Sequence, residues 1–248
     1  MKTILKVEGL FKEFDEIKIL RGINLQVKYG EFVAIMGQSG SGKSTLLYNI
    51  SGMDTPSEGL VCFDGEDISK FDDEKMSKIR LKKMGFVFQK SHLLKTLSIR
   101  DNIVLPAFKA KIKTRKDVNL FAEELMQRVG IEAIKDREIS KVSGGQLQRA
   151  AICRALINSP EIIFGDEPTG ALNSSASKEI MDIINEINKQ GTTVILVTHD
   201  AKVAARADRV IFLSDGNIKD EINLGKYDGV SSFQREDKMV GWLGEQVF

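Results

Sequence analysis

Short runs of apolar, often β-branched residues recur along the chain, and each is bounded by glycine, aspartate or threonine. Runs of this length without polar alternation are typical of strands that are buried on both faces of a sheet. The pattern predicts strands at Phe32–Met36, Phe86–Phe88, Ile162–Phe164, Val194–Val197 and Val210–Leu213.

Between these runs the apolar residues adopt helical spacing. Ile180, Ile183, Ile184 and Ile187 recur every three or four positions, and Gly191 is placed to end that helix. Strands that alternate with helices predict an α/β core with a largely parallel sheet.

The stretch from about Ser98 to Val142 carries helical spacing and no strand signal. Val118, Phe121, Leu125 and Val129 fit one face of a helix. We therefore expect a helical insertion or subdomain within the α/β core.

The tail from Lys226 is polar, but Trp242, Leu243, Val247 and Phe248 stand near its end. Two interpretations are open. Either these residues dock a short helix on the body of the protein, or the tail is mobile.

Composition narrows the class of protein. With 42% hydrophobic and 29% charged residues, the 248-residue chain has the make-up of a soluble globular protein. Its net charge of +1 gives no electrostatic reason to expect nucleic acid as a partner. Cys62 and Cys153 belong to no CxxC pair, which favours a reducing compartment. No run approaches the roughly 20 apolar residues that span a bilayer, and the N-terminus lacks a signal-peptide core.

The strand predicted at Phe32–Met36 runs into a glycine- and serine-rich stretch that matches G-x-x-x-x-G-K-[ST]. Glycines allow successive N–H groups to point at phosphate oxygens, and the following helix adds its positive N-terminal end. We expect Lys43 to hold the β- and γ-phosphates and the Ser44 hydroxyl to ligate Mg²⁺. A chance match is the alternative, but the strand before and the helix after argue against it. The predicted phosphate-binding residues are Gly37, Gln38, Ser39, Gly40, Ser41, Gly42, Lys43, Ser44 and Thr45.

Two adjacent acids, Asp166 and Glu167, follow the strand predicted at Ile162–Phe164. A buried strand rarely ends in two carboxylates without a reason, because an unpaired charge is costly to desolvate. Beside a phosphate loop, Asp166 is expected to hold the Mg²⁺ shell and Glu167 to polarise the water that attacks the γ-phosphate. The alternative is that both acids cap the turn that follows them.

His199 follows the strand predicted at Val194–Val197. A lone histidine is more often structural or solvated than functional. At a strand end in a phosphate-loop fold it can instead contact the γ-phosphate, so both interpretations stay open on the residues alone.

The segment Ser143-Gly144-Gly145-Gln146 resembles the signature motif of ABC transporter ATPases, and it lies some twenty residues before the acidic pair, as it does in that family. Ser143 and the glycine amides are expected to open a helix from Gln146 to about Asn158, whose N-terminus can hold an anion. In the family this cradle faces the ATP that is bound by the other subunit. A simple Gly-Gly helix cap is the alternative.

The resemblance covers roughly Leu5 to Asn223, and it implies the fold class, the partners and the cofactors. The fold class is α/β: a P-loop NTPase with a mostly parallel core sheet, an N-terminal antiparallel β part and a helical subdomain at about 90–160. The nucleotide-binding domain would occupy 1–225 and the C-terminal tail 226–248. The cofactors would be ATP and Mg²⁺, and the chain would form a homodimer around two ATP molecules on a separate integral membrane permease, at the cytoplasmic face of the membrane.

The resemblance also assigns roles to single residues. Phe14 matches the aromatic residue that stacks on adenine, and Phe11 is the competing candidate. Gln89 resembles the glutamine that senses Mg²⁺ and the attacking water while it touches the membrane subunit. Glu167 resembles the catalytic base and His199 the switch histidine of the family.

One position departs from the family pattern. Asn173 stands in a loop that usually carries aspartate and crosses the dimer interface. Its amide still donates and accepts hydrogen bonds but has no charge. Communication between the two ATP sites is therefore expected to differ in detail, while hydrolysis is not put in doubt.

Within the family, the sequences around Phe32–Met36 and Asp166–Leu172 resemble one branch. This branch contains the ATPases of macrolide export, lipoprotein release, the cell-division transporter-like complex and bacitracin-type antimicrobial-peptide resistance. The Gly-Ala-Leu-Asn loop and the chain length favour the peptide-resistance type. A regulatory role, in which hydrolysis gates an extracellular enzyme, is a rival that this chain does not distinguish from transport.

Two other classes of ABC ATPase fit the sequence less well. Those of DNA repair and chromosome organisation carry long heptad segments, whereas only about a hundred residues without sustained heptads separate Lys43 from Ser143 here. The ribosome-acting proteins carry two ATPase domains in one chain, and this chain has one set of motifs.

The membrane subunit is expected to contact Gln89 and the segment Ser91–Asn102. An apolar groove for a helix of the permease is one interpretation of the leucines in this segment, and internal packing is the other. The residues in question are His92, Leu93, Leu94 and Leu97.

Overall fold

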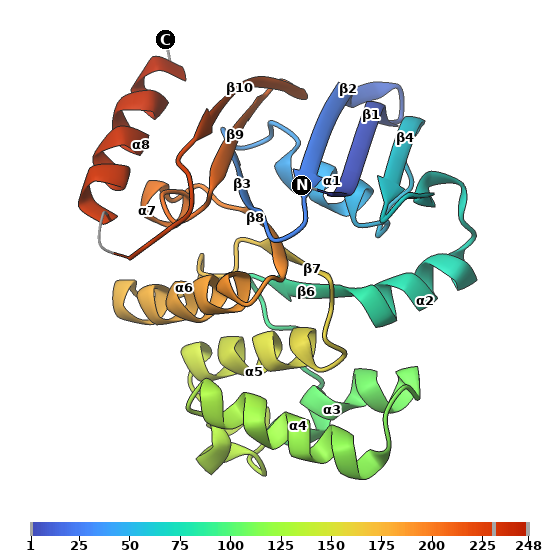
Figure 1. Cartoon of the computed structure of the whole chain (residues 1–248), viewed down its shortest axis with the longest axis vertical. Coiled ribbons are helices and arrows are strands. Elements are labelled where there is room, and N and C mark those ends of the chain that lie inside the picture. Colours follow the sequence, from blue (N-terminus) through green and yellow to red (C-terminus); the bar gives the residue numbers. More distant parts are fainter. Residues whose placement is uncertain (1, 230–231, 247–248) are drawn as a thin grey trace. The chain divides into compact units, whose positions relative to one another are not determined.

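The computed structural model describes residues 2–229 and 232–246, and it divides into two compact units. Unit 1 comprises Met1–Met76 and Ile187–Phe248, and unit 2 comprises Ser77–Glu186. Figure 1 labels the elements of both. Helices α2 (Asp73–Lys83) and α6 (Ser174–Lys189) cross the boundaries between the units.

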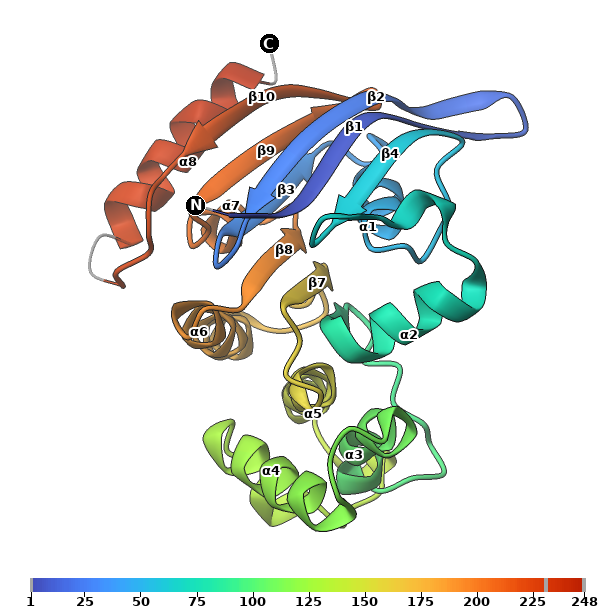
Figure 2. The ribbon, with the colours of Figure 1, turned by 45° about the vertical axis from the view of Figure 1, so that its right-hand side comes forward.

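Unit 1 contains an antiparallel sheet with the strand order β2-β1-β4-β5, in which β1, β2 and β4 lie side by side (Figure 2). Buried and exposed residues alternate along the second half of β2, as expected for a sheet with one face on a core. Strands β1 and β2 are joined by Asp15 and Glu16, whose φ angles of 46° and 67° are those of a two-residue hairpin turn. The strands are β1 (Thr3–Phe14), β2 (Ile17–Lys28), β4 (Glu58–Phe63) and β5 (Glu66–Asp67).

The second sheet of unit 1 is mostly parallel. Strand β3 (Phe32–Gly37) pairs in parallel with β8 (Thr193–Val197) on one side and β9 (Arg209–Ser214) on the other. Strand β10 (Asn217–Asn223) pairs antiparallel with β9. Helix α1 (Lys43–Ile50) follows β3, and helix α7 (Ala201–Ala204) follows β8. Because β3 and β8 run the same way, their carboxyl ends lie at one edge of the sheet.

Most of the described tail is a docked helix, α8 (Ser232–Gln246). Trp242 packs edge-on against Phe212 of β9, and its indole N–H donates to Asp220 of β10 at 2.8 Å. This finding decides between a docked helix and a mobile tail for Ser232–Gln246. Val247 and Phe248 lie outside the described residues.

Unit 2 combines a parallel strand pair with a helical part. Strand β6 (Met84–Phe88) pairs with β7 (Ile162–Asp166), and Phe88 stands opposite Asp166. The helices α3 (Ile99–Ala110), α4 (Arg115–Arg128) and α5 (Gly144–Leu156) share one apolar core that includes Ile103, Leu125 and Cys153. Short 3₁₀ turns occur at Ile68–Lys70 in unit 1 and at Glu132–Ile134 and Ile139–Lys141 in unit 2.

All five strands predicted from apolar runs are present, each extended by one or two residues. The helical segments predicted for 98–142 are present as α3 and α4. The proposed subdomain of about 90–160 lies within unit 2, which also holds β6 and β7. Its status as a separate domain stays a prediction.

Candidate functional site

The glycine-rich loop of unit 1 connects β3 to α1, and its backbone requires glycine. Gly37, Gly40 and Gly42 have φ angles of 150°, 80° and 98°, which side chains rarely allow. A Cβ on Gly37 would lie 2.1 Å from the carbonyl oxygen of Leu213 in β9. The loop therefore needs glycine for its conformation and, at Gly37, for its packing.

Helix α1 begins at Lys43, and its N-cap residue, Gly42, makes no side-chain capping bond. The N-terminal end of a helix presents backbone N–H groups and a positive partial charge, which suit a phosphate. The Nζ of Lys43 donates to the carbonyl oxygens of Gly37 at 3.0 Å and Gln38 at 2.7 Å. The loop thus holds the Lys43 ammonium group beside the N-terminus of α1. Together they form the set of hydrogen-bond donors that a triphosphate requires.

His199 lies at the same edge of the sheet, directly after β8. It is exposed, whereas Thr198 before it is buried and donates its backbone N–H to Ile35 of β3 at 3.1 Å. Asp200 then caps α7 by accepting from the backbone N–H of Lys202. Unit 1 therefore brings the phosphate loop and His199 to one edge of one sheet.

The two candidates for adenine stacking differ in exposure. Phe14 ends β1 at the tip of the hairpin with 49% of its surface exposed, and the Nζ of Lys12 lies 4.7 Å from its ring centroid. Phe11 packs against the neighbouring strand, where a Cβ on Gly22 would lie 3.1 Å from its ring. Phe14 offers the more accessible ring for a base.

Unit 2 carries the remaining candidate residues of the hydrolytic site. Gln89 follows β6, Asp166 ends β7 and Glu167 follows it, so all three lie at one edge of this strand pair. A Cβ built on Gly170 would lie 2.9 Å from Nε2 of Gln89 and 3.1 Å from Oε2 of Glu167. The amide of Gln89 and the carboxylate of Glu167 therefore converge above Gly170.

Glu167 has a φ of 48°, in the left-handed region that glutamate adopts at a cost of about 1 kcal/mol. Its carbonyl oxygen accepts from the N–H of Gly170 at 3.0 Å, which closes the turn at Pro168 and Thr169. The turn that follows the strand end thus directs the Glu167 side chain towards Gln89.

The signature segment forms a helix N-terminus. Ser143 caps α5: its Oγ accepts from the N–H of Gln146, and the Gln146 side chain accepts from the N–H of Ser143 at 3.0 Å. This reciprocal arrangement is a capping box, which satisfies two of the orphan donors. The helix begins at Gly144, two residues before the predicted start at Gln146, and ends at Leu156, two residues before the predicted end.

Two side chains of α5 hold the end of β6 and the segment after it. The buried Gln148 donates to the carbonyl oxygen of Phe88 at 2.9 Å, next to Gln89. Arg154 donates to the carbonyl oxygens of Ser91 and His92, each at 2.7 Å. Sequence reasoning missed both residues. Their only signal is that they are large polar residues on an alanine-rich helix.

The segment Ser91–Asn102 divides between core and surface. Leu93 belongs to the core of the helical part, whereas Leu94 is 50% exposed. The amide of Asn102, which is buried, bonds both the N–H and the carbonyl of Leu94. Leu93 therefore packs internally, whereas Leu94 lies on an accessible surface.

Asn173 begins the turn into α6. Its Oδ1 accepts from the N–H of Ala176 at 2.9 Å, and its carbonyl oxygen accepts from Ser177 at 2.8 Å. This is the bond of a helix N-cap, for which asparagine and aspartate serve almost equally well. The departure from the family pattern therefore leaves the local fold intact.

Among residues 2–229 and 232–246, no group of three or more His, Cys, Asp or Glu side chains forms a metal site. Mg²⁺ in nucleotide sites keeps several waters and takes one or two protein ligands plus phosphates, so it does not require a cluster of three such side chains. Within the same described residues, no helix has the length and apolarity to cross a membrane.

Comparison with known proteins gives consistent matches. The ABC transporter family model matches residues 20–170. The ABC transporter ATP-binding protein YvrO of Bacillus subtilis is 45% identical over 218 residues, covering 88% of this chain and 94% of YvrO. The macrolide export ATP-binding/permease protein MacB of Campylobacter fetus is 45% identical over 219 residues, which cover 87% of this chain. The match spans only 34% of the length of that MacB.

A solved structure matches over most of the chain. The dimeric post-hydrolysis state of the ATP-binding cassette MJ0796, bound to ADP and Pi, has a TM-score of 0.83 and 38% sequence identity. The match covers 90% of this chain and 100% of the MJ0796 chain. CbiO1 from Clostridium perfringens, described as part of an ABC transporter complex, has a TM-score of 0.82 and 30% identity, and it covers the whole chain.

Proposed function

Because this chain belongs to the ABC transporter family and is an ATP-binding ATPase of that family, we propose that its ATP hydrolysis drives a separate membrane permease. The proposed phosphate cradle is the loop from Gly37 to Thr45, with Lys43 on the β- and γ-phosphates. Its glycine conformations and the helix N-terminus at Lys43 support this role. Phe14 stacks on the adenine, which its exposure supports.

The hydrolytic step is assigned to the residues at the strand ends. Ser44, Asp166 and Gln89 would hold Mg²⁺ or its water shell, and the bound ion would neutralise charge on the phosphates. Glu167 accepts a proton from the attacking water, and His199 contacts the γ-phosphate. The observation that carries this proposal is the convergence of Gln89 and Glu167 above Gly170, since it pairs an amide that can orient a water with a carboxylate that can activate it.

We further propose that two copies form a head-to-tail dimer around two ATP molecules. The cradle from Ser143 to Gln146 in one copy would face the nucleotide held by Lys43 in the other. Support comes from the dimeric MJ0796 cassette and from the helix N-terminus that Ser143 opens. Closure then depends on ATP and hydrolysis reopens the dimer, which gives two states whose balance a permease can use.

The test is the substitution Glu167→Gln, which removes the proposed base but keeps the size of the side chain. In size-exclusion chromatography with ATP, this variant should elute as a dimer, and its ATPase rate should fall by a factor of about 100 or more. The double variant that adds Lys43→Ala should stay monomeric, because it lacks the cation for the phosphates. A Glu167→Gln variant that remains monomeric at saturating ATP, or that hydrolyses ATP at the wild-type rate, would contradict the proposal.

The permease is the proposed partner, and it would hold the chain at the cytoplasmic face of the membrane. The MacB relatives combine an ATP-binding part with a permease, and this chain spans about a third of their length. The exposed Leu94, five residues after Gln89, supports a contact with a cytoplasmic helix of such a permease. Nucleic acid is not a proposed partner, given the net charge of +1.

For the cargo, we propose antimicrobial peptides of the bacitracin type, and macrolides as the second candidate because the MacB relatives carry that name. A strain without the gene should become more sensitive to the peptides, and complementation with the Glu167→Gln variant should not restore resistance. Sensitivity to macrolides alone would favour the second candidate. Co-purification in mild detergent identifies the permease. Recovery of soluble DNA- or ribosome-associated factors without a membrane protein would refute membrane coupling.

A further inference from the structure

The connection that follows His199 is short and has little intrinsic stability. Helix α7 has four residues, Ala201–Ala204, and isolated helices of this length do not persist in water. Beyond it, the carbonyl groups of Ala205 and Ala207 are buried and lie past the last helical turn, so they need partners from elsewhere in the chain. The stability of this connection therefore depends on contacts from other segments.

Those partners come from a single arginine of the C-terminal helix. Arg235 donates from Nε to Ala205 O at 2.7 Å and from Nη2 to Ala207 O at 2.5 Å. It also donates to the carbonyl oxygens of Leu224 at 2.8 Å, Gly225 at 3.1 Å and Lys226 at 3.4 Å. A guanidinium has five N–H groups, so these carbonyls match its whole donor set.

Arg235 reaches this place at an electrostatic cost. Its surface is 7% exposed, and burial lowers the pKa of its guanidinium, while Asp208 and Asp228 oppose that shift. The ring of Tyr227 lies 5.5 Å from Arg235, which adds a cation–π contact. A buried arginine surrounded by carbonyls specifies its position more strictly than an apolar residue would, because any displacement leaves polar groups unpaired.

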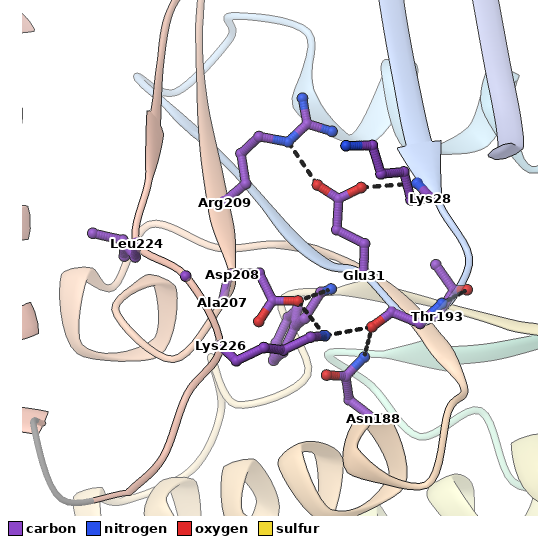
Figure 3. Close-up of polar contacts among 12 residues, drawn as sticks. Lys28, Glu31, Asn188, Thr193, Ala207, Asp208, Arg209, Leu224 and Lys226 are labelled. Atoms are coloured by element: carbon purple, nitrogen blue, oxygen red, sulfur yellow. Dashed lines mark hydrogen bonds and ion pairs between the residues drawn. The ribbon is translucent and has the colours of Figure 1, made fainter. Parts of the chain in front are cut away.

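The segment between β10 and α8 is also fixed to the start of β3. Lys226 donates to Asp208 Oδ2 at 2.6 Å, and Asp208 Oδ2 accepts from the N–H of Phe32 at 2.9 Å (Figure 3). Lys226 and Asn188 both donate to the carbonyl oxygen of Gly30. Arg235 of α8 therefore bonds the carbonyls of a segment that is itself attached to the strand leading into the phosphate loop.

We infer that Arg235 is a positioning residue for ATP hydrolysis, holding the end of α7 so that His199, at the other end, keeps its place. The inference rests on the role proposed above for His199. Arg235 is not among the residues proposed to contact the nucleotide or the attacking water, and it acts through the single turn of α7, about 6 Å long. Arg235 then connects the C-terminal helix to the hydrolytic site, and loss of this helix should slow hydrolysis more than it weakens ATP binding.

The test measures ATPase kinetics of the full chain with Arg235→Ala, Arg235→Lys, His199→Ala and the double variant Arg235→Ala/His199→Ala. Arg235→Ala should lower kcat about ten-fold and leave KM for ATP within about two-fold, since the nucleotide contacts are unchanged. Arg235→Lys should recover part of kcat, because an ammonium supplies three of the five donors. In the His199→Ala background, Arg235→Ala should change kcat by less than about two-fold, because the two residues act in series.

Two control variants separate this role from general docking of α8. Asp220→Ala removes the acceptor of Trp242 at the far end of α8 without touching Arg235, and it should keep wild-type kcat. Lys238→Ala, on the exposed face of the same helix, should also be silent. Hydrogen exchange should become faster over residues 199–207 in Arg235→Ala. If Arg235→Ala folds poorly, this measurement and the kinetics of Arg235→Lys test the inference instead.

Three results would overturn the inference: an equal kcat loss from Arg235→Ala in the wild-type and His199→Ala backgrounds, an equal loss from Asp220→Ala, or faster exchange at 199–207 with unchanged kcat. All three leave the proposed function intact. If His199→Ala hydrolyses ATP at the wild-type rate, the role of His199 fails and the inference fails with it. The single variant His199→Ala is sufficient to recognise this failure of the proposed role of His199.

Discussion

Replacing Gly170 by alanine tests the geometry of the proposed hydrolytic centre directly. The new methyl group would lie 2.9 Å from Nε2 of Gln89 and 3.1 Å from Oε2 of Glu167. Ordinary contact between such atoms begins near 3.5 Å, so each side chain must move by about half an ångström. Gly170 itself is not among the glycines with positive φ, and its backbone accepts alanine without strain.

The expected effects on activity and stability have opposite directions. Displacement of a catalytic group by about 1 Å can cost roughly 100-fold in rate, so a shift of half that size should lower kcat by a factor of about 10 to 100. The stability should not fall, because the displaced atoms are the ends of flexible side chains. Alanine also restricts the unfolded chain, which raises the free energy of unfolding by about 0.4–1 kcal/mol.

The assay combines steady-state ATPase kinetics with urea unfolding. Gly241→Ala is the matched control: a Cβ there would meet no atom within 4 Å, so this variant should gain about 1 kcal/mol of stability and keep wild-type kcat. A Gly170→Ala variant with wild-type kcat would refute the view that the places of Gln89 and Glu167 limit hydrolysis. A variant that loses activity only because it unfolds would refute the packing argument instead.

Two further predictions concern stability. Asn173→Ala should lower the free energy of unfolding by about 1 kcal/mol in urea denaturation, because α6 loses its N-cap, whereas Asn173→Asp should not; equal losses would contradict the capping role. Burial raises the pKa of the Cys153 thiol from 9.0 to about 12, so the thiol is neutral in the folded chain up to that pH. Its contribution to stability is full below pH 9 and falls as the pH rises towards 12, by up to about 1.4 kcal/mol per unit, because only the unfolded thiol ionises in that range. Unfolding midpoints from pH 8 to pH 10 check this, and Cys153→Ala should lack that part of the decline.

Features that depend on local sequence were predictable. The strand at Phe32–Met36 is apolar on both faces, and this alone indicates a buried strand. The loop after it is identified by glycines whose backbone angles other residues rarely adopt. The capping residue Ser143 and the helix that it opens follow from the same kind of short-range chemistry.

The antiparallel strands β1, β2 and β4 were expected only from the resemblance, not from their own residues. Their alternation is interrupted by bulges, which shift the register between Val7 and Leu10 in β1 and hide the period of two. The hairpin residues Asp15 and Glu16 lack the glycine that usually marks such a turn. Local pattern was therefore insufficient at these strands.

Other features depend on contacts between residues that are far apart in the chain. Such features leave no periodic signal in the sequence, because each depends on which residues pack against it. Examples are the docking of α8, the different burial of Leu93 and Leu94, and the convergence of Gln89 with Glu167 above Gly170. Arg235 is the clearest case: in the sequence it is one charged residue in a polar tail, and in the folded chain it is buried and bonds five carbonyl groups. Spacing along the chain determines which face of a helix or strand is apolar, whereas the partner of a buried polar group is determined only when the chain folds and removes that group from water.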